Sequence, residues 1–354
     1  MNFKTSKKRV AVIFGGVGPE HSVSVEGADF LVSVLERTEY VPIPVYVSRS
    51  GKWQMFPRGS KPSKIAKGGV VGIKTFPVRL GCKSGFLICG GVLPVFAAIP
   101  LMHGDGGEDG TVAGALSLAG IDYVGADTVG SALSFNKAYA KAIAESVGIP
   151  TLPWLYFSSS SLKSESPSWA DDVEEGLGYP VFVKPATLGS SVGCAPARER
   201  QELVSAVCAA SKLSCGVLVE RMLEAPRELE VAYFGTKSKE IFTKPGEIFC
   251  KSGFYSYEEK YSEQSQATVL TSADISSAQG ELLREYSRAL VHALGIRHLC
   301  RIDFFLGGGK IYFNEINTIP GMTRASLYPA MLSASGVSHE DMAIGLIESA
   351  VAKK

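Results

Sequence analysis

The sequence lacks the features that mark membrane, secreted and nucleic-acid-binding proteins. It contains no run of about 18 apolar residues. Its start, MNFKTSKKRVAVIFGG, has only a short apolar run and no small-residue cleavage site. The 36 basic and 35 acidic residues leave a formal net charge of +1, too little to concentrate nucleic acid or an anionic membrane. We therefore expect a cytoplasmic protein that binds neither nucleic acid nor membrane.

Metal-type cysteine pairs and the common nucleotide-binding loops are also missing. The seven cysteines, an odd number, include no CxxC pair, so we expect reduced and mostly buried thiols without a role. No GxxxxGK[ST] loop occurs, and the glycines of GGVGPE do not have the GxGxxG spacing of a dinucleotide site. Any nucleotide must therefore be bound in another way.

The composition is that of a large globular α/β protein. A chain of 354 residues exceeds the size at which one hydrophobic core keeps growing, so two or three domains are expected. Hydrophobic residues make up 45% of it, and the 38 glycines and 18 prolines indicate many tight turns.

The first part of the chain has the pattern of a mostly parallel sheet. The β-branched run from Arg9 to Gly16 ends in paired glycines, and helix-spaced apolar residues follow from Val23 to Leu35. Further short apolar runs predict more strands, with ligands at the carboxyl edge of the sheet. We expect this domain to end near Asp127. The further runs are YVPIPVYVS, VLPVFAAIPLMHG and IDYVG.

A smaller unit and an antiparallel sheet are expected in the rest of the chain. A helical pattern covers Ser131 to Ala144, and a charged helix is predicted over 198–211 after a strand and a serine-containing turn. SSSSLKSESPSW is typical of a surface loop. A hairpin is expected across the glycines 307–309, and a last helix over 340–353. The other antiparallel strands are predicted in CGVLVERML, LEVAYFG and EIFTKPGEIF.

The turn Gly189–Gly193, GSSVG, admits three interpretations. It matches the GxSxG turn of serine hydrolases, which needs an acid and then a histidine, and the later histidines are His292, His298 and His339. A glycine-flanked serine pair is equally suited to bind phosphate through backbone N–H groups, because glycine lets the backbone approach the anion. An ordinary turn is the third possibility, and the turn by itself does not decide.

Polar residues interrupt the two apolar strands of the predicted hairpin. Alternation places Arg301 and Asp303 on one face of the first strand. It also places Glu315 and Asn317 on one face of the second. Two carboxylates and an amide oxygen are hard ligands of the type that magnesium takes when it also binds nucleotide phosphates. The alternative is a structural ion pair between Arg301 and Asp303, with Asn317 starting a turn.

Nine segments in order resemble the ATP-grasp superfamily, and specifically the D-alanine–D-alanine ligase family. One such motif is weak evidence, whereas nine in order across nearly the whole chain are highly specific. The resemblance implies an α/β fold, α+β in its ATP-grasp part: a Rossmann-like substrate domain (1–127), a central lid subdomain (128–218) and a C-terminal catalytic subdomain (219–354). The segments are GGVGPEHSVSV, LMHGDGGEDGT, FNKAYAK, VFVKPATLGSSVG, VERMLEAPRELEV, FYSYEEKY, RIDFF, NEINTIPGMT and SLYP.

The resemblance also implies a nucleotide site between two antiparallel sheets. Lys137 and Lys184 resemble the lysines that hold the ATP phosphates. The backbone from Val219 to Leu223 resembles the hinge that reads the adenine, and Glu228 the carboxylate on the ribose. The implied ATP-binding residues are Lys137, Lys184, Ser190, Glu220, Arg221, Met222, Leu223 and Glu228. The implied ligands of two Mg²⁺ ions, for which Mn²⁺ can substitute, are Asp303, Glu315 and Asn317.

The implied reaction joins two D-alanines through a D-alanyl phosphate, for peptidoglycan precursor synthesis. Arg301 and the Gly321 N–H are implied to stabilise the tetrahedral oxyanion. Glu20 is implied to bind the first ammonium group, in a set with Ser190 and Tyr261. The loop FYSYEEKY is expected to close over the site, since an acyl phosphate must be kept from water. The other implied substrate residues are His103 and Glu108 at the first D-alanine, and Lys260, Ser326 and Leu327 at the second.

Three rival functions remain at this stage. The chain could be an ATP-grasp carboxylate–amine ligase for another amino acid, an esterase or peptidase that uses Ser190, or a catalytically silent nucleotide-binding homologue. Tyr261 and the uncharged Leu327 favour D-alanine over D-lactate or D-serine as the second substrate. The relatives imply a homodimer.

Overall fold

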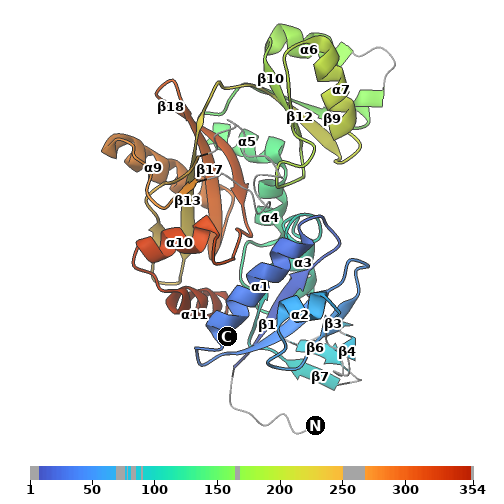
Figure 1. The fold of residues 1–354 in the computed structure, drawn as a ribbon, viewed down its shortest axis with the longest axis vertical. Helices are drawn as coiled ribbons and strands as arrows, with labels where there is room; N and C mark the ends of the chain where they lie inside the picture. Colours follow the sequence, from blue (N-terminus) through green and yellow to red (C-terminus); the bar gives the residue numbers. More distant parts are fainter. Residues whose placement is uncertain are drawn as a thin grey trace.

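The described residues of the computed structural model form four sheets, and the three larger ones are arranged along the long axis of the molecule (Figure 1). The N-terminal sheet lies at one end, a small four-stranded sheet at the other, and the largest sheet between them. No helix among the described residues is long and apolar enough to cross a membrane. The structure describes residues 8–68, 76–77, 79–80, 85–88, 91–163, 168–249 and 268–351.

The N-terminal sheet has a parallel centre, as predicted. Its strand order is β4-β3-β2-β1-β8, and β1 is parallel to both β2 and β8, whereas β3 and β4 are antiparallel additions. Every β1 residue from Val10 onward is buried, as expected for a strand covered on both faces. The strands are β1 (Arg9–Gly15), β2 (Val41–Val47), β3 (Trp53–Met55), β4 (Phe76–Pro77) and β8 (Ala97–Pro100).

Two of the predicted N-terminal strands differ from expectation. The run VLPVFAAIPLMHG contains two strands, because β7 joins a separate antiparallel sheet of order β5-β6-β7. The run IDYVG makes only an isolated bridge, between Tyr123 and Ala98. The extra strands are β5 (Arg79–Leu80), β6 (Gly85–Ile88) and β7 (Gly91–Pro94), and the helices of this part are α1 (His21–Leu35), α2 (Pro62–Ala66) and α3 (Thr111–Leu118).

The small sheet is antiparallel, with the order β11-β10-β12-β9. The prediction that β12 belongs with the later strands is wrong, because it pairs with β10 and β9 along its whole length. The proposed boundary after 218 would cut this strand, so we propose that the small unit ends after Arg221. Its elements are β9 (Trp154–Ser158), η1 (Ser161–Lys163), α6 (Ser168–Gly176), β10 (Val181–Pro185), β11 (Ala195–Ala197), α7 (Arg200–Ala210) and β12 (Gly216–Arg221).

The helical pattern from Ser131 to Ala144 contains two helices, α4 (Thr128–Phe135) and α5 (Lys137–Ser146). Asn136 separates them, because its backbone is extended and its side-chain oxygen accepts hydrogen bonds from the first amides of α5. Ala140 of α5 belongs to the same buried cluster as residues of the large sheet. These helices therefore pack on the large sheet.

The large sheet has the order β16-β15-β13-β17-β18, with β14 beside β13. The predicted hairpin is confirmed, and its turn requires glycine, since Gly308 and Gly309 have φ of +57° and +75°. The strands are β13 (Arg227–Gly235), β14 (Glu240–Phe242), β15 (Gly246–Phe249), β16 (Thr268–Leu270), β17 (Leu299–Gly307) and β18 (Lys310–Asn317), and the helices are α9 (Ser277–Ala293), α10 (Leu327–Ala334) and α11 (His339–Ala350).

No disulfide joins the cysteines among the described residues. The expectation that they are mostly buried is wrong for this part of the chain. Cys300 is buried in β17, but Cys208 and Cys215 are exposed.

Candidate active site

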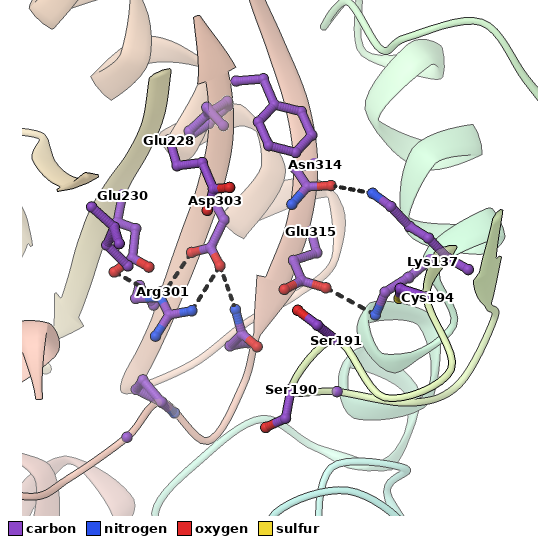
Figure 2. Close-up of a pocket in the computed structure, with 18 of the residues that line it drawn as sticks. Lys137, Ser190, Ser191, Cys194, Glu228, Glu230, Arg301, Asp303, Asn314 and Glu315 are labelled. Carbon is purple, nitrogen blue, oxygen red and sulfur yellow. Dashed lines mark hydrogen bonds and ion pairs between the residues drawn. The ribbon is translucent and has the colours of Figure 1, made fainter. Parts of the chain in front are cut away.

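One cavity of about 770 Å³ is lined by residues of the N-terminal part, of the small unit and of the large sheet. It is bordered by the start of α1, by the loop between β10 and β11, by β12, and by the β17–β18 hairpin with the segment that follows it. Figure 2 shows Arg301, Asp303 and Glu315 on the hairpin, with Lys137 and the Ser190–Ser191 loop opposite them.

Arg301 is held by two carboxylates. Its Nε and Nη2 atoms donate to the two oxygens of Asp303 at 2.8 and 2.7 Å, and Nε lies 3.0 Å from Glu230 on the neighbouring strand β13. Burial alone would lower the pKa of Arg301, but the two carboxylates raise it well above its usual range. The guanidinium is therefore permanently charged. Glu230 is a site residue that the sequence analysis did not identify.

Asp303 lies opposite Glu315 in the register of the hairpin. Asn317, two residues after Glu315 on β18, lies opposite Arg301. Asn317 donates a hydrogen bond from Nδ2 to Asp303 at 3.1 Å, so the three predicted ligands are brought together. Where side chains are described, no group of three or more His, Cys, Asp or Glu is arranged to hold a metal ion. The donor set here is instead two carboxylates and an amide, which suits a hard cation such as Mg²⁺.

Lys137, the first residue of α5, reaches Glu315 of this carboxylate pair. Its Nζ lies 2.8 Å from Glu315 and donates to the carbonyl of Leu188 at 2.8 Å. Burial would lower the pKa of Lys137, but Glu315 outweighs burial and raises it. The predicted phosphate-binding lysine is thus charged, and it connects the hairpin to the loop after β10.

Lys184 lies on β10 of the small sheet and contacts β18 of the hairpin. Its Nζ donates to Oδ1 of Asn314 at 2.9 Å and lies 2.5 Å from the carboxylate of Glu220. The second oxygen of Glu220 lies 2.9 Å from Nζ of Lys141 on α5. Glu220 therefore sits between two lysines, and its predicted part in reading adenine stays a prediction. Lys141 and Asn314 were not among the predicted site residues.

The remaining predicted nucleotide residues follow Glu220 along the cavity wall. Arg221, Met222, Leu223 and Glu228 all line the cavity. The Met222 amide donates to the carbonyl of Pro180 at 3.0 Å, and the Arg221 guanidinium binds the Leu177 carbonyl, so both hold the segment to the small unit. The segment therefore forms a fixed connection between the small sheet and the large one.

The Ser190 hydroxyl donates to the Glu20 carboxylate, which joins the loop after β10 to the start of α1. Ser190 and Ser191 have φ of +54° and +58°, a left-handed conformation that is uncommon for residues other than glycine. The loop connects β10 to the antiparallel strand β11. A nucleophile elbow would instead run from a strand into a helix, so the structure does not support the hydrolase interpretation.

The three later histidines also lie elsewhere. His292 contacts Glu240, His298 forms a hydrogen bond with the backbone of Gly125, and His339 packs edge-to-face against Phe30 of α1. None of the three lines the cavity that holds Ser190. A pair of Ser190 with any of these three histidines is therefore excluded.

His103 and Glu108 border the cavity beside Glu20. Burial lowers the pKa of His103, although Glu20 opposes the shift. Burial, reinforced by Glu20, raises the pKa of Glu108 to about 8. Its carboxyl accepts from the Gly104 amide at 3.0 Å. Both groups beside Glu20 are thus largely neutral near pH 7.

The segment after β18 closes the opposite wall. Ser326 accepts a hydrogen bond from the Thr323 amide at 2.9 Å, and a Cβ atom on Gly321 would lie 3.0 Å from the Ser326 hydroxyl. Gly321, Ser326 and Leu327 line the cavity, and their implied oxyanion and second-substrate roles stay predictions. Lys260 and Tyr261, predicted for the second D-alanine and for catalysis, lie outside the described residues.

Comparisons with known proteins place the chain in a family. The model of the D-ala D-ala ligase N-terminus matches residues 9–126, and that of the D-ala D-ala ligase C-terminus matches residues 143–348. A D-alanine–D-alanine ligase of Treponema pallidum is 35% identical over 349 residues, 96% of this chain and 87% of the relative. A ligase of the same name from Acetivibrio thermocellus is 35% identical over 366 residues, 98% of this chain and 96% of the relative.

Solved structures agree with these relatives. The VanG D-Ala:D-Ser ligase from Enterococcus faecalis superposes with a TM-score of 0.86 at 32% identity, over 98% of this chain and 100% of that one. The D-alanyl-alanine synthetase A from Vibrio cholerae gives 0.84 at 33% identity, with the same coverage. The predicted fold, a Rossmann-like sheet domain followed by a two-lobed ATP-grasp part, is confirmed. The chain belongs to the D-alanine–D-alanine ligase family.

Proposed function

We propose that the protein uses ATP to join two D-alanines into D-alanyl-D-alanine, releasing ADP and phosphate, for peptidoglycan precursor synthesis. One observation carries the proposal beyond family membership. Two lysines, an arginine and the two facing carboxylates of the hairpin line one cavity, where Lys137 pairs with Glu315 and Arg301 with Asp303. Such a set can hold a polyphosphate and stabilise the negative charge that develops during acyl transfer.

The phosphates of ATP would lie between the two sheets. Lys137 and Lys184 are cations on flexible stems, and the backbone of the loop at Ser190 can donate N–H groups. Asp303, Glu315 and Asn317 would hold Mg²⁺, or Mn²⁺ in its place. The cation would supply positive charge to neutralise the phosphoryl oxygens. The segment from Glu220 to Leu223 would hold the adenine, and Glu228 the ribose.

The first D-alanine would lie at the start of α1. Glu20 would pair with its ammonium group, and His103 would border it. The substrate carboxylate attacks the γ-phosphorus of ATP, so a carboxylate-oxygen-to-phosphorus bond forms as the bond to ADP breaks. The product is D-alanyl phosphate. This step is needed because a free carboxylate is a poor electrophile toward an amine.

The second D-alanine attacks the carbonyl carbon of the acyl phosphate through its neutral amine. The tetrahedral intermediate carries an oxyanion, which Arg301 and the amide of Gly321 would stabilise. Expulsion of phosphate and loss of the amine proton complete the amide. Ser326 and Leu327 would contact the second substrate, and Lys260 and Tyr261 are proposed to contribute from outside the described residues.

One of the similar solved structures suggests a second candidate product, D-alanyl-D-serine. The Enterococcus faecalis structure with a TM-score of 0.86 is a D-Ala:D-Ser ligase. D-alanyl-D-serine is therefore the rival product, although Leu327 in the second-substrate wall favours D-alanine. The homodimer expected from the relatives is also a proposal, which light scattering of the purified protein would test.

The test is phosphate release from Mg-ATP by the purified protein, with the products identified by mass. D-alanine alone, L-alanine, D-lactate plus D-alanine, and D-serine plus D-alanine would be compared. We expect phosphate release with D-alanine alone, with D-alanyl-D-alanine as the product, and its loss in Arg301→Ala. Turnover that requires D-serine would favour the rival product, and no turnover with any D-amino acid would refute the proposed function.

A further inference from the structure

Lys141 is a buried charge to which neither the sequence nor the proposed reaction gives a role. It lies one turn after Lys137 on α5, and its side chain is only 1% exposed. Its Nζ lies 2.9 Å from Oε2 of Glu220 and 3.4 Å from the carbonyl oxygen of Phe313. Burying an ammonium group is costly unless the group is paired, so Lys141 must be retained for what it pairs with.

Glu220 is the partner that Lys141 shares with Lys184. Lys141 lies at one carboxylate oxygen, and Lys184 lies 2.5 Å from the other. The carboxylate is itself only 2% exposed. Burial would raise the pKa of Glu220, but the two lysines together lower it to about 2, so the carboxylate is charged.

The three side chains carry an excess of positive charge. Two ammonium groups against one carboxylate give formal charges that sum to +1 in a buried site. Lys184 lines the cavity, whereas Lys141 lies behind it and does not. Among the residues that the structure describes, Glu220 and Asn314 are the polar partners of Lys184, so one of its three ammonium hydrogens is available to a ligand. The excess positive charge is therefore accessible from the cavity at Lys184.

We propose that Lys141 is a positioning residue that neutralises Glu220 from behind, so that Lys184 keeps its positive charge for the phosphates of the nucleotide. Without Lys141, the carboxylate would be neutralised by Lys184 alone at 2.5 Å. A lysine that is already paired in this way attracts an anion far less strongly. This inference rests on the proposed function, because it takes the anion to be a nucleotide phosphate.

A second contact supports the same role. Phe313, whose carbonyl oxygen Lys141 approaches, precedes Asn314 on β18, and Asn314 binds Lys184. Lys141 thus contacts the Glu220 side chain on one flank of Lys184 and the backbone beside Asn314 on the other. Removing its charge would disturb the position of Lys184 without touching the ligand directly.

The experiment compares the binding of ADP and of adenosine to wild type and Lys141→Met by titration calorimetry. Methionine keeps the unbranched shape and removes the charge. We expect ADP to bind roughly tenfold or more weakly to the variant, as for loss of a contact to a charged group. Adenosine has no phosphate, so its affinity should change less than about twofold. Lys212→Met, an exposed lysine outside the cavity, is the matched control.

A double-mutant cycle separates this role from a structural one. In Glu220→Gln, Lys184 no longer faces a carboxylate, so adding Lys141→Met should reduce ADP affinity less than about twofold. The double variant has no carboxylate at position 220, so no buried negative charge is left without Lys141. It can therefore still be compared with Glu220→Gln if Lys141→Met alone does not fold.

Three results would overturn the inference. They are an equal loss of ADP and adenosine binding in Lys141→Met, no loss of ADP binding in it, and a loss in the Glu220→Gln background as large as in wild type. If wild type itself bound no ADP, the proposed function would fall, and the inference with it.

Discussion

Asp303 lies directly opposite Glu315 in the register of β17 and β18, and the register shifts immediately after this pair. Phe304 is opposite Phe313, so Asn314 is the extra residue of a β-bulge. In a regular strand, Asn314 and Glu315 would point to opposite faces. The bulge instead lets both reach lysines in one cavity, Asn314 toward Lys184 and Glu315 toward Lys137.

Asn314→Ala is therefore expected to weaken ATP binding. The change removes the 2.9 Å acceptor of Lys184, and loss of a hydrogen bond to a charged group should raise the KM for ATP roughly tenfold. The KM values for D-alanine should change much less. Phosphate release at varied ATP measures the effect, with Lys310→Ala, an exposed residue on the same strand, as the control. An unchanged KM for ATP would show that Asn314 does not position Lys184.

Strand alternation was enough to predict part of the site. Arg301 and Asp303 were expected on one face, and Glu315 and Asn317 on one face of the next strand, and all four line the cavity. Charged residues on apolar strands are informative, because burial requires compensation. The bulge at Asn314 could not be predicted, since a single extra residue leaves no mark in the alternation of so short a segment.

The burial of Lys141 and the pairing of β12 could not be predicted from the sequence either. A lysine on a helix is exposed in most proteins, so nothing in the sequence distinguished the buried Lys141 from a surface residue. The apolar run of β12 predicts a strand but not its partners, and pairing with β10 and β9 depends on contacts distant in the sequence. The family resemblance implied residues that would contact ligands, and it left out Glu230, Lys141 and Asn314, which pair with them.

Arg301→Lys tests whether the guanidinium fork is required. Arginine binds both oxygens of Asp303 and keeps a contact with Glu230, whereas an ammonium group cannot reproduce two parallel bonds. If Arg301 stabilises the oxyanion, kcat should fall by a factor on the order of 10² or more. Steady-state kinetics measures this, with the exposed Arg297→Lys as control. A kcat close to wild type would remove Arg301 from the proposed chemistry.

Glu20→Gln tests the site of the first D-alanine. The substitution keeps a hydrogen-bonding partner for Ser190 and removes the negative charge that would pair with the substrate ammonium. The KM for the first D-alanine should rise roughly tenfold or more, with little change in the KM for ATP. Glu36→Gln, exposed at the end of the same helix, is the control. An equal rise in both KM values would indicate a general disturbance of the loop instead.

Ser190 should not react with a fluorophosphonate probe, because its loop runs into a strand and its hydroxyl binds Glu20. Ser190→Ala should lower the affinity for D-alanine, through the loss of support for Glu20, while leaving a folded and nucleotide-binding protein. Intact-mass measurement after incubation with the probe checks the first expectation, and calorimetry with ADP checks the second. Stoichiometric labelling of wild type that is lost in Ser190→Ala would revive the hydrolase interpretation.

His298 links the N-terminal part to the large sheet, because its Nδ1 accepts a hydrogen bond from the Gly125 amide at 3.0 Å. Burial, together with Arg297 and Lys237, lowers the pKa of His298 to about 4. Between about pH 6.5 and 4 the unfolded chain therefore binds a proton that the folded protein does not. The free energy of unfolding should fall as the pH falls through this window, by up to about 1.4 kcal/mol per pH unit from this group.

His298→Asn tests this expectation, because asparagine tolerates the positive φ of 69°. In urea unfolding at several pH values, the free energy of unfolding of the variant should depend less steeply on pH than that of wild type. Carboxylates titrate equally in both proteins, so identical pH slopes for variant and wild type would mean that His298 is not the responsible group.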